Sequence, residues 1–201
     1  MTRYAAIEGI DGAGKSTVAA GVAATLEQRG LEVVRVREPG GTPAGEAVRE
    51  ILLGSASDLA DWTEALLFAA ARSQLAASII APALAAGSIV ISDRCVYSSL
   101  AYQGAGRGLD LDAVRRVNEA GLGEVWPDTV MLLRLDPVRG LAREDEADRI
   151  SLAGAELHRR VAAAYDDLAA SEPERFVVID GSRSIDEVIG AAIEALDSRW
   201  W

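Results

Sequence analysis

Cysteine, histidine and positive charge are all scarce in this chain of 201 residues. The single cysteine, Cys95, excludes an intrachain disulfide and a cysteine zinc cluster, and it favours a reducing compartment. The single histidine, His158, excludes a histidine cluster, and its neighbours Arg159 and Arg160 predict a solvated surface position. Lysine and arginine number 20 against 31 aspartates and glutamates, which gives a net charge of -11. Such a surface repels extended phosphate backbones, so nucleic acid and acidic membranes are poor candidate partners.

Glycine and proline, at 19 and 6 residues, are too few for a collagen-like or disordered chain. Half of the residues (50%) are apolar, which is typical of a globular protein with a large core. The length fits one domain, placed at 1–201. Charge appears at Glu8 and Asp11 before a secretory hydrophobic region can form. We therefore expect a mature, cytoplasmic protein.

The stretch 73–92 lacks charged residues and is long enough to span a bilayer. It is interrupted by Ser73, Gln74, Pro82 and Gly87, and much of the rest is alanine. This composition argues against a membrane span. We expect a buried helix followed by a buried strand.

Short apolar runs alternate with segments of helical period along the whole chain. Strands are expected at 4–7, 31–36, 89–91, 130–135 and 176–179, and helices at 15–28, 44–53 and 61–81. This alternation predicts an α/β fold with a mostly parallel central sheet and helices on both faces. The exception is 139–151, whose dense charge predicts a mobile surface segment, or lid, at about those residues.

A phosphate-binding motif, G-x-x-x-x-G-K-[ST], lies between the first predicted strand and the first predicted helix. Glycines allow backbone N–H groups to surround a phosphate, Lys15 bridges β- and γ-oxygens, and the Ser16 hydroxyl binds Mg²⁺. The flanking pattern disfavours a chance glycine-rich turn. The motif predicts a P-loop that binds a nucleoside triphosphate through Gly9, Ile10, Asp11, Gly12, Ala13, Gly14, Lys15, Ser16 and Thr17.

Three polar residues complete the predicted phosphate site. Asp11 would repel a phosphate unless it points elsewhere, so it either faces a hydroxyl of a second ligand or is a solvated turn residue. Asp93 ends a predicted strand, where a carboxylate can hold Mg²⁺ directly or through water. Arg94 suits a phosphate bidentately, although a strand-end ion pair with a helix is the alternative.

The absence of an N-K-x-D motif counts against a GTPase switch. Within the helix expected at 61–81, the stripe Trp62, Leu66, Phe68 and Leu75 is expected to be mostly core. Phe68 and Arg72 are nevertheless four residues apart, so they can present a ring and a guanidinium together to a flat base.

The chain resembles the thymidylate kinases of bacterial type over nearly its whole length. The P-loop alone is shared by many kinases and ATPases, whereas Arg-Glu-Pro-Gly-Gly-Thr at 37–42 and Ser-Ser-Leu-Ala-Tyr-Gln-Gly at 98–104 are far more specific. The remaining matches are Phe68 with Arg72, Asp93-Arg94, Pro127-Asp128 and Asp148-Arg149.

The resemblance implies transfer of a phosphoryl group from ATP to dTMP, giving ADP and dTDP for dTTP synthesis, with Mg²⁺ and in a homodimer. It implies that Ser16 and Asp93 hold the metal and that Lys15 and Arg94 are catalytic. It also implies substrate roles. Phe68 stacks on thymine, Arg72 bonds its carbonyl edge, and Gln103 contacts the base. Arg94 holds the acceptor phosphate, Asp11 lies near the 3′-hydroxyl, Tyr102 crowds the 2′ position, and Ser99 contacts the substrate.

Members of this family differ in whether the P-loop or the lid supplies a catalytic arginine. This P-loop reads Gly12-Ala13 without arginine, which implies the lid type with Arg143 and Arg149 as candidates. The resemblance also implies a cis bond before the proline of the segment at 37–42. Two departures are Cys95, where an aromatic residue is usual, and Ser151, where an acidic residue is frequent.

Other functions compatible with these motifs are a kinase for another small acceptor and a P-loop ATPase switch without an acceptor. The pairs Phe68 with Arg72 and Tyr102 with Gln103 favour thymidylate, and an ATPase switch would not be stimulated by dTMP. An interaction module with a vestigial loop is disfavoured because Lys15 is present together with Ser16 and Asp93.

Overall fold

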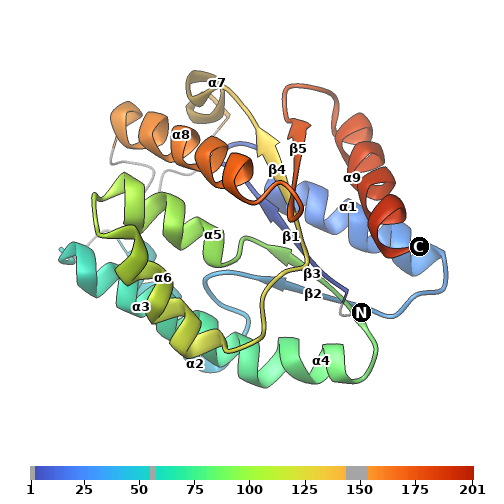
Figure 1. The fold of residues 1–201 in the computed structure, drawn as a ribbon, viewed down its shortest axis with the longest axis horizontal. Helices are drawn as coiled ribbons and strands as arrows, with labels where there is room; N and C mark the ends of the chain where they lie inside the picture. Colours follow the sequence, from blue (N-terminus) through green and yellow to red (C-terminus); the bar gives the residue numbers. More distant parts are fainter. Residues whose placement is uncertain (1–2, 55–57, 144–153) are drawn as a thin grey trace.

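Five strands form one parallel sheet within the residues that the computed structural model describes, 3–54, 58–143 and 154–201. The strand order is β2-β3-β1-β4-β5 (Figure 1). The strands are β1 (Tyr4–Glu8), β2 (Val33–Arg37), β3 (Ile89–Asp93), β4 (Thr129–Arg134) and β5 (Phe176–Asp180). The predicted α/β class is confirmed, and all carboxyl ends of the strands meet at one edge of the sheet.

Helices cover both faces of the sheet: α1 and α9 pack together on one face, whereas α8 and α5 lie on the other (Figure 1). The α-helices are α1 (Lys15–Gln28), α2 (Pro43–Leu53), α3 (Asp61–Leu75), α4 (Ala81–Ala85), α5 (Val96–Ser99), α6 (Leu111–Leu122), α7 (Pro137–Leu141), α8 (Ala155–Ser171) and α9 (Ile185–Trp200). Two π-helical segments are η1 (Ala76–Ile80) and η2 (Leu100–Gly106).

The register of the three central strands assembles the carboxyl edge. Ile7 near the end of β1 is paired with Asp93 of β3 on one side and Met131 of β4 on the other. These strands are almost entirely buried, as expected of parallel strands covered on both faces. The loop that follows β1 therefore begins beside Asp93.

The stretch tested above as a membrane span, 73–92, lies partly in a continuous helical run through α3, η1 and α4 and partly in β3. By length and composition, with a mean hydropathy of 1.4, the run Asp61–Ala85 is apolar enough to cross a membrane. In this fold α3 packs against α2 and α6, and the chain then enters the buried strand β3. The expected buried strand is confirmed, but the helix is buried along one side only and α4 has no fully buried residue.

The expectation that the apolar stripe of α3 is mostly core is half wrong. Phe68 and Leu75 are buried, but Trp62 and Leu66 are 38% and 51% exposed. Trp62 and Leu66 are four residues apart and share a face of α3 that points away from the core. Apolar residues therefore occupy two faces of this helix, only one of which meets the protein interior.

The predicted surface position of His158 is wrong, because its side chain is fully buried. Its helix α8 packs against η2, and the buried face includes Val161, Tyr165 and Leu168. His158 precedes these residues by three, seven and ten positions, which places it on the same helical face. Its two arginine neighbours in the sequence, Arg159 and Arg160, point to solvent.

Candidate active site

The loop between β1 and α1 has the backbone that its glycines predict. Gly12 and Gly14 have φ angles of 74° and 89°, in the left-handed region that favours glycine. A Cβ atom on Gly12 would collide with the carbonyl oxygen of Gly140 in α7. The glycines thus allow the loop to turn and to pack closely against α7, the helix in which the expected lid begins.

Lys15 is held inside this loop by the loop's own backbone. Its side chain is 7% exposed, and Nζ donates a hydrogen bond to the carbonyl oxygen of Ile10 at 2.6 Å. Burial, assisted by the neighbouring charge of Arg94, lowers the Lys15 pKa to about 8. The ammonium group is therefore charged at neutral pH but poorly solvated, an arrangement that favours an incoming anion.

Ser16 and Asp93 place two oxygen atoms side by side at the carboxyl edge of the sheet. Ser16 Oγ donates to Asp93 Oδ2 at 2.5 Å. Hydroxyl and carboxylate oxygens suit a hard divalent cation such as Mg²⁺. Among the described residues there is no group of three or more His, Cys, Asp or Glu side chains that could hold a metal. The pair therefore fits a cation whose other ligands are phosphate oxygens and water.

The Asp11 carboxylate lies among Lys15 of the phosphate loop, Arg94 directly after β3, and Tyr102 of η2. Its carboxylate accepts hydrogen bonds from Tyr102 Oη at 2.9 Å and from Arg94 Nη2, and it lies 3.8 Å from Lys15 Nζ. Burial on its own would raise the Asp11 pKa, but the charges of Arg94 and Lys15 and the bond from Tyr102 lower it to about 2. Asp11 is thus not a solvated turn residue; it is a permanent negative charge that neutralises Arg94.

Arg94 occupies an unusual backbone conformation, with a φ of 70°. Its guanidinium lies 5.2 Å from the ring centroid of Tyr102, a cation–π distance. With the described residues, Nη1 makes only long contacts, at 3.4 Å to the Gly9 carbonyl oxygen and 3.3 Å to Ser98 Oγ. One side of the guanidinium is therefore engaged by Asp11, and the other is weakly bonded.

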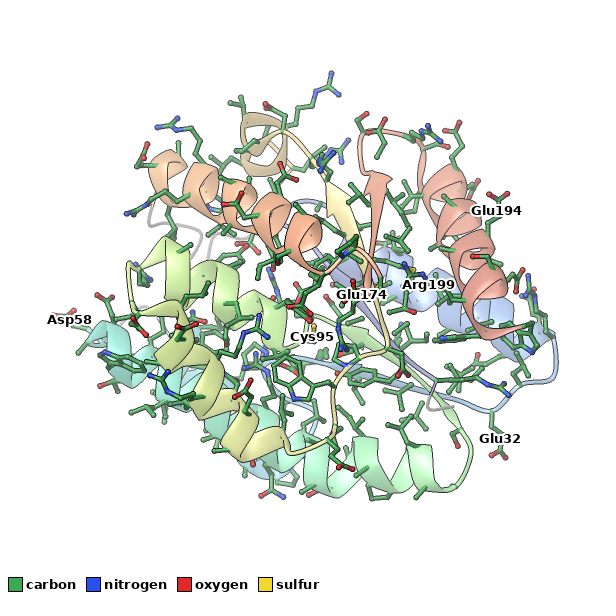
Figure 2. All side chains as sticks on the ribbon, viewed as in Figure 1. Glu32, Asp58, Cys95, Glu174, Glu194 and Arg199 are labelled. Atoms are coloured by element: carbon green, nitrogen blue, oxygen red, sulfur yellow. The ribbon has the colours of Figure 1, made fainter. Side chains whose placement is uncertain are left out.

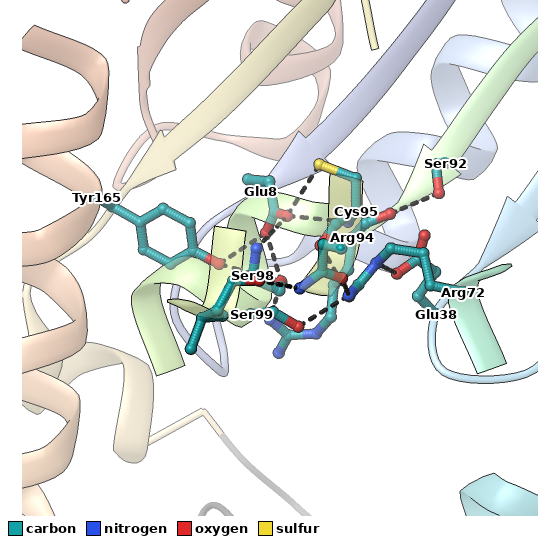
Figure 3. A network of polar contacts seen from close by, with 11 residues as sticks. Glu8, Glu38, Arg72, Ser92, Arg94, Cys95, Ser98, Ser99 and Tyr165 are labelled. Atoms are coloured by element: carbon teal, nitrogen blue, oxygen red, sulfur yellow. Dashed lines mark hydrogen bonds and ion pairs between the residues drawn. The ribbon is translucent and has the colours of Figure 1, made fainter. Parts of the chain in front are cut away.

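Glu8, which the sequence analysis did not identify, holds the turn that carries Arg94 (Figure 3). Its buried carboxylate accepts from the backbone N–H groups of Cys95 and Ser98, both at 2.9 Å. Ser98 Oγ and Tyr165 Oη each donate to Oε2 at 2.7 Å, and Cys95 Sγ lies 3.2 Å from Oε1. No local pattern indicates Glu8, because its partners are distant in sequence.

Cys95 lies in the protein interior, whereas acidic side chains such as Glu32 and Glu194 lie at the periphery (Figure 2). Burial raises the pKa of its thiol well above the ordinary value, and the nearby Glu8 carboxylate raises it further. The thiol is therefore protonated and donates a hydrogen bond to Glu8. This bond fixes the small Cys95 side chain next to the turn that carries Arg94. Ser151 lies outside the described residues.

Phe68 and Arg72 stand on the same side of α3 but meet different surroundings. Phe68 lines a cavity, whereas Arg72 is only 2% exposed and is absent from the cavity wall. Four of the five Arg72 N–H groups have protein partners: Glu38 Oε2 at 2.6 Å, Ser99 Oγ at 2.9 Å, Asn118 Oδ1 at 2.6 Å and the Cys95 carbonyl oxygen at 3.2 Å. Within the described part of the chain, one N–H of Nη2 has no hydrogen-bond partner.

The cavity has a volume of about 400 Å³, in the range of small-molecule sites. The expected site residues that line it are Asp11, Gly12, Gly14, Lys15, Ser16, Thr17, Phe68, Asp93, Arg94, Tyr102, Gln103 and Arg143. Gly9, Ile10 and Ala13 belong to the loop without lining the cavity, Arg72 and Ser99 are buried outside its wall, and Arg149 lies outside the described residues.

The sequence analysis assigned no role to several other residues of the cavity wall, including Arg37, Glu38, Pro39, Arg49 and Leu53. The first three belong to the segment at 37–42, which the sequence analysis matched to the family. That match could have identified them as candidate site residues. The Glu38–Pro39 bond is cis, as the resemblance implied. Arg49 and Leu53 lie on α2, where no motif marks them; they are four residues apart on one helical face.

Tyr102 and Gln103 are consecutive residues of η2 and both line the cavity. π-helical segments are rare and frequently occur at functional sites. Arg143, from the expected lid, also lines the cavity, and its Nη1 donates to the Gly181 carbonyl oxygen at 3.3 Å. The cavity thus joins the P-loop, β3, α3, η2 and the start of the lid.

Comparison with known proteins agrees with this architecture. The family model for thymidylate kinase matches residues 7–191. The thymidylate kinase of Deinococcus radiodurans is 43% identical over 199 residues, covering 98% of this chain and 97% of that protein. That of Bifidobacterium longum (strain DJO10A) is 46% identical over 197 residues, covering 96% and 95%.

A solved structure of thymidylate kinase from Ehrlichia chaffeensis superimposes with a TM-score of 0.81 at 33% identity, covering 97% of this chain and 98% of that one. The fold, the P-loop and these full-length similarities agree. The chain therefore belongs to the thymidylate kinase family and phosphorylates dTMP to dTDP.

Proposed function

We propose that residues 1–201 act as one nucleoside monophosphate kinase domain with a lid at about 139–151, and that ATP and dTMP meet in the 400 Å³ cavity. The observation that carries this proposal is the composition of the cavity wall. Gly12, Gly14 and Lys15 of the phosphate loop share it with Phe68 and Arg94, which suit a base and a phosphate. Donor and acceptor phosphates bound there would be neighbours, as direct transfer requires.

On the donor side, the P-loop backbone and Lys15 hold the β- and γ-phosphates of ATP. Ser16 and Asp93 would hold Mg²⁺, which when bound would supply positive charge beside the transferred group. Thr17 completes the loop at the first turn of α1. Lys15, already desolvated, offers its charge to the phosphates without losing a large hydration shell.

The base of ATP has a candidate place in a second hollow, of about 580 Å³, at the carboxyl ends of β4 and β5. The sheet order puts this hollow on the opposite side of the P-loop from β3 and the acceptor cavity. Its wall includes the exposed apolar Val178 and the guanidinium groups of Arg139 and Arg183, which suit a flat aromatic ring. ATP would thus span from this hollow to the P-loop.

On the acceptor side, Arg94 holds the dTMP phosphate through the weakly bonded Nη1 side of its guanidinium, and Arg49 supplies a second positive charge. Asp11, locked as a carboxylate, accepts from the 3′-hydroxyl of the sugar. Phe68 stacks on thymine. Arg72 bonds the carbonyl edge of the base through its remaining Nη2 N–H. Because this guanidinium is buried outside the cavity wall, the base must enter deeply enough to uncover it, while Ser99 keeps it in place.

The transfer needs no general base. The phosphate of dTMP has a second pKa near 6, so its attacking oxygen is already an anion at pH 7. A bond forms between this oxygen and the γ-phosphorus as the bond from the γ-phosphorus to the β-bridging oxygen breaks, releasing ADP. The protein contributes positioning and positive charge from Lys15, Arg94 and an arginine of the lid, Arg143 or Arg149.

The proposed arrangement includes a homodimer in the cytoplasm. Support for a dimer comes from exposed apolar side chains on neighbouring helices α2, α3 and α6, namely Ile51, Trp62, Leu66 and Leu111. Large apolar side chains exposed on adjoining helices are the kind of surface that a protein interface would cover. A second copy of the chain is the partner that this proposal assigns to them.

A panel of nucleoside monophosphates, tested with ATP and Mg²⁺ in a coupled ADP-release assay, tests the assignment of the cavity. We expect the highest kcat/KM with dTMP and little ADP release without an acceptor. ADP release that dTMP does not stimulate would contradict the proposal and favour an ATPase switch.

Selection of deoxyribose over ribose is expected to depend on the ring of Tyr102. The ring is 5% exposed and its hydroxyl is tied to Asp11, the proposed 3′-hydroxyl partner, so it lies beside the sugar. A 2′-hydroxyl buried there without a partner costs about 1–3 kcal/mol, or roughly tenfold to a hundredfold in kcat/KM. Tyr102→Ala should lower the ratio of kcat/KM for dTMP to kcat/KM for the corresponding ribonucleotide by about this factor.

Tyr102→Phe is the matched control, because it keeps the ring and removes only the hydrogen bond to Asp11. We expect it to retain the sugar preference. If Tyr102→Ala lowered kcat/KM for both acceptors equally, with a reduced Tm, Tyr102 would be a core aromatic and sugar selection would lie elsewhere.

A further inference from the structure

Glu64 is a buried carboxylate outside the cavity wall that none of the roles above uses. It lies on α3, four residues before Phe68 and eight before Arg72, so the three residues follow one helical face. Its Oε1 accepts a hydrogen bond from Gln103 Nε2 at 2.9 Å. Arg107 donates to the same carboxylate through Nε at 3.3 Å and Nη2 at 3.0 Å.

This contact decides which end of the Gln103 amide meets a ligand. A carboxylate paired with a guanidinium only accepts hydrogen bonds, so it must face the amide nitrogen and not the amide oxygen. Among the described residues, no donor contacts Gln103 Oε1, although the side chain lines the cavity. The polar atom that Gln103 offers to a base is therefore an acceptor.

A hydrogen-bond acceptor at Gln103 Oε1 can distinguish thymine from cytosine by the edge of the base. Thymine has a donor at N3 beside an acceptor at O4, whereas cytosine has an acceptor at N3 beside an amino donor. Gln103 Oε1 matches the N3–H of thymine and opposes the N3 lone pair of cytosine. The single N–H left on Arg72 matches the O4 of thymine in the same way.

We propose that Glu64 is a positioning residue that orients the Gln103 amide and thereby selects thymine over cytosine. The inference rests on the proposed placement of the base beside Phe68 and Gln103. Arg107 supplies the countercharge of Glu64 and lies 3.9 Å from Asp61 as well, but it does not contact the Gln103 amide.

The decisive comparison uses dTMP and 5-methyl-dCMP, which carry the same methyl group and differ only at the base edge. The wild type should prefer dTMP by at least about a hundredfold in kcat/KM, because a site built to hydrogen-bond one edge rejects an analogue that leaves its groups unpaired. Equal use of both acceptors by the wild type would overturn the proposal without any variant.

Glu64→Gln keeps the shape of the side chain but adds an amide donor, so the Gln103 amide is free to turn over. We expect the dTMP preference over 5-methyl-dCMP to fall at least about tenfold, while the KM for ATP and the Tm stay close to wild type. Arg107→Lys is the matched control: it changes the hydrogen bonds of the same cluster but keeps the countercharge and the carboxylate facing Gln103, so the preference should persist.

Gln103→Ala separates failure of the inference from failure of the base placement. If Gln103→Ala narrows the preference and Glu64→Gln does not, Glu64 has no positioning role, and the placement of the base stands. If Gln103→Ala leaves the preference at its wild-type value, the base placement and the inference both fail. An equal loss for both acceptors in Glu64→Gln, with a lower Tm, would mark Glu64 as structural only.

Discussion

Replacing Lys15 with alanine is expected to lower kcat for dTMP phosphorylation at least about a hundredfold. Lys15 Nζ is held in the phosphate loop by the Ile10 carbonyl oxygen, and it shares the cavity with the acceptor-side Arg94. It thus provides positive charge where the transferred phosphoryl group must pass. Turnover by purified Lys15→Ala enzyme, measured at saturating ATP and dTMP, tests this; a wild-type kcat would remove the P-loop assignment.

The same substitution should not destabilise the fold, which separates catalysis from folding. The Lys15 pKa is about 8 in the folded protein against an ordinary value of 10.5, so the fold binds this proton less tightly than an unfolded chain does. At pH 7 the charge therefore opposes folding, and its removal should leave the Tm unchanged or raised. A large fall in Tm would mean that Lys15 has a packing role.

The pH dependence of nucleotide affinity should reflect the protonation of Lys15. Because only the protonated ammonium attracts the phosphates, the affinity for a non-hydrolysable ATP analogue should weaken as the pH rises through about 8. Calorimetric titration of wild type and Lys15→Ala across pH 7 to 9 checks this. The weakening should be present in the wild type and absent from the variant.

Loss of both lid arginines, Arg143 and Arg149, is expected to lower kcat by roughly a thousandfold, the lower end of the range for arginines that stabilise phosphoryl transfer. The P-loop carries Gly12-Ala13 and no arginine, so charge on the transferred group must be met from elsewhere. Arg143 lines the cavity, and among the described residues its guanidinium donates a hydrogen bond to the Gly181 carbonyl oxygen at 3.3 Å.

Because this charge develops in the transition state, the KM for dTMP should scarcely change in the double variant. Steady-state kinetics of Arg143→Ala, Arg149→Ala and the double variant will show which arginine contributes more. Arg160→Ala is a matched control, since Arg160 is an exposed arginine of α8 that does not line the cavity. A double variant with normal kcat would contradict the lid-arginine type.

The local sequence determined the elements and the phosphate loop. Helix α1 begins and ends where its composition predicted, and the apolar run at 89–91 is a buried strand that delivers Asp93 at its carboxyl end. These features depend on near neighbours: side-chain periodicity, glycine backbone freedom and the fixed spacing of Lys15 after the loop. The four-residue spacing of Phe68 and Arg72 likewise predicted a shared face of α3.

The tertiary structure decided what those side chains contact. Asp11 meets Arg94 and Tyr102, which are 83 and 91 positions away, and Glu8 meets Tyr165 across 157 positions. Such pairs arise where parallel strands and their helices converge at one edge, a geometry that no local pattern encodes.

The burial of helix residues was likewise predicted only in part from the sequence. Periodicity indicates that α3 and α8 each have an apolar face, but it does not say which neighbour covers it. Leu66 on α3 is exposed and His158 on α8 is buried, because covering helices lie over one side of each helix and not the other. The sequence thus determined which side chains are available at this site. Tertiary packing determined which of them are in contact, because contacts between the sheet and its helices depend on how these elements are assembled.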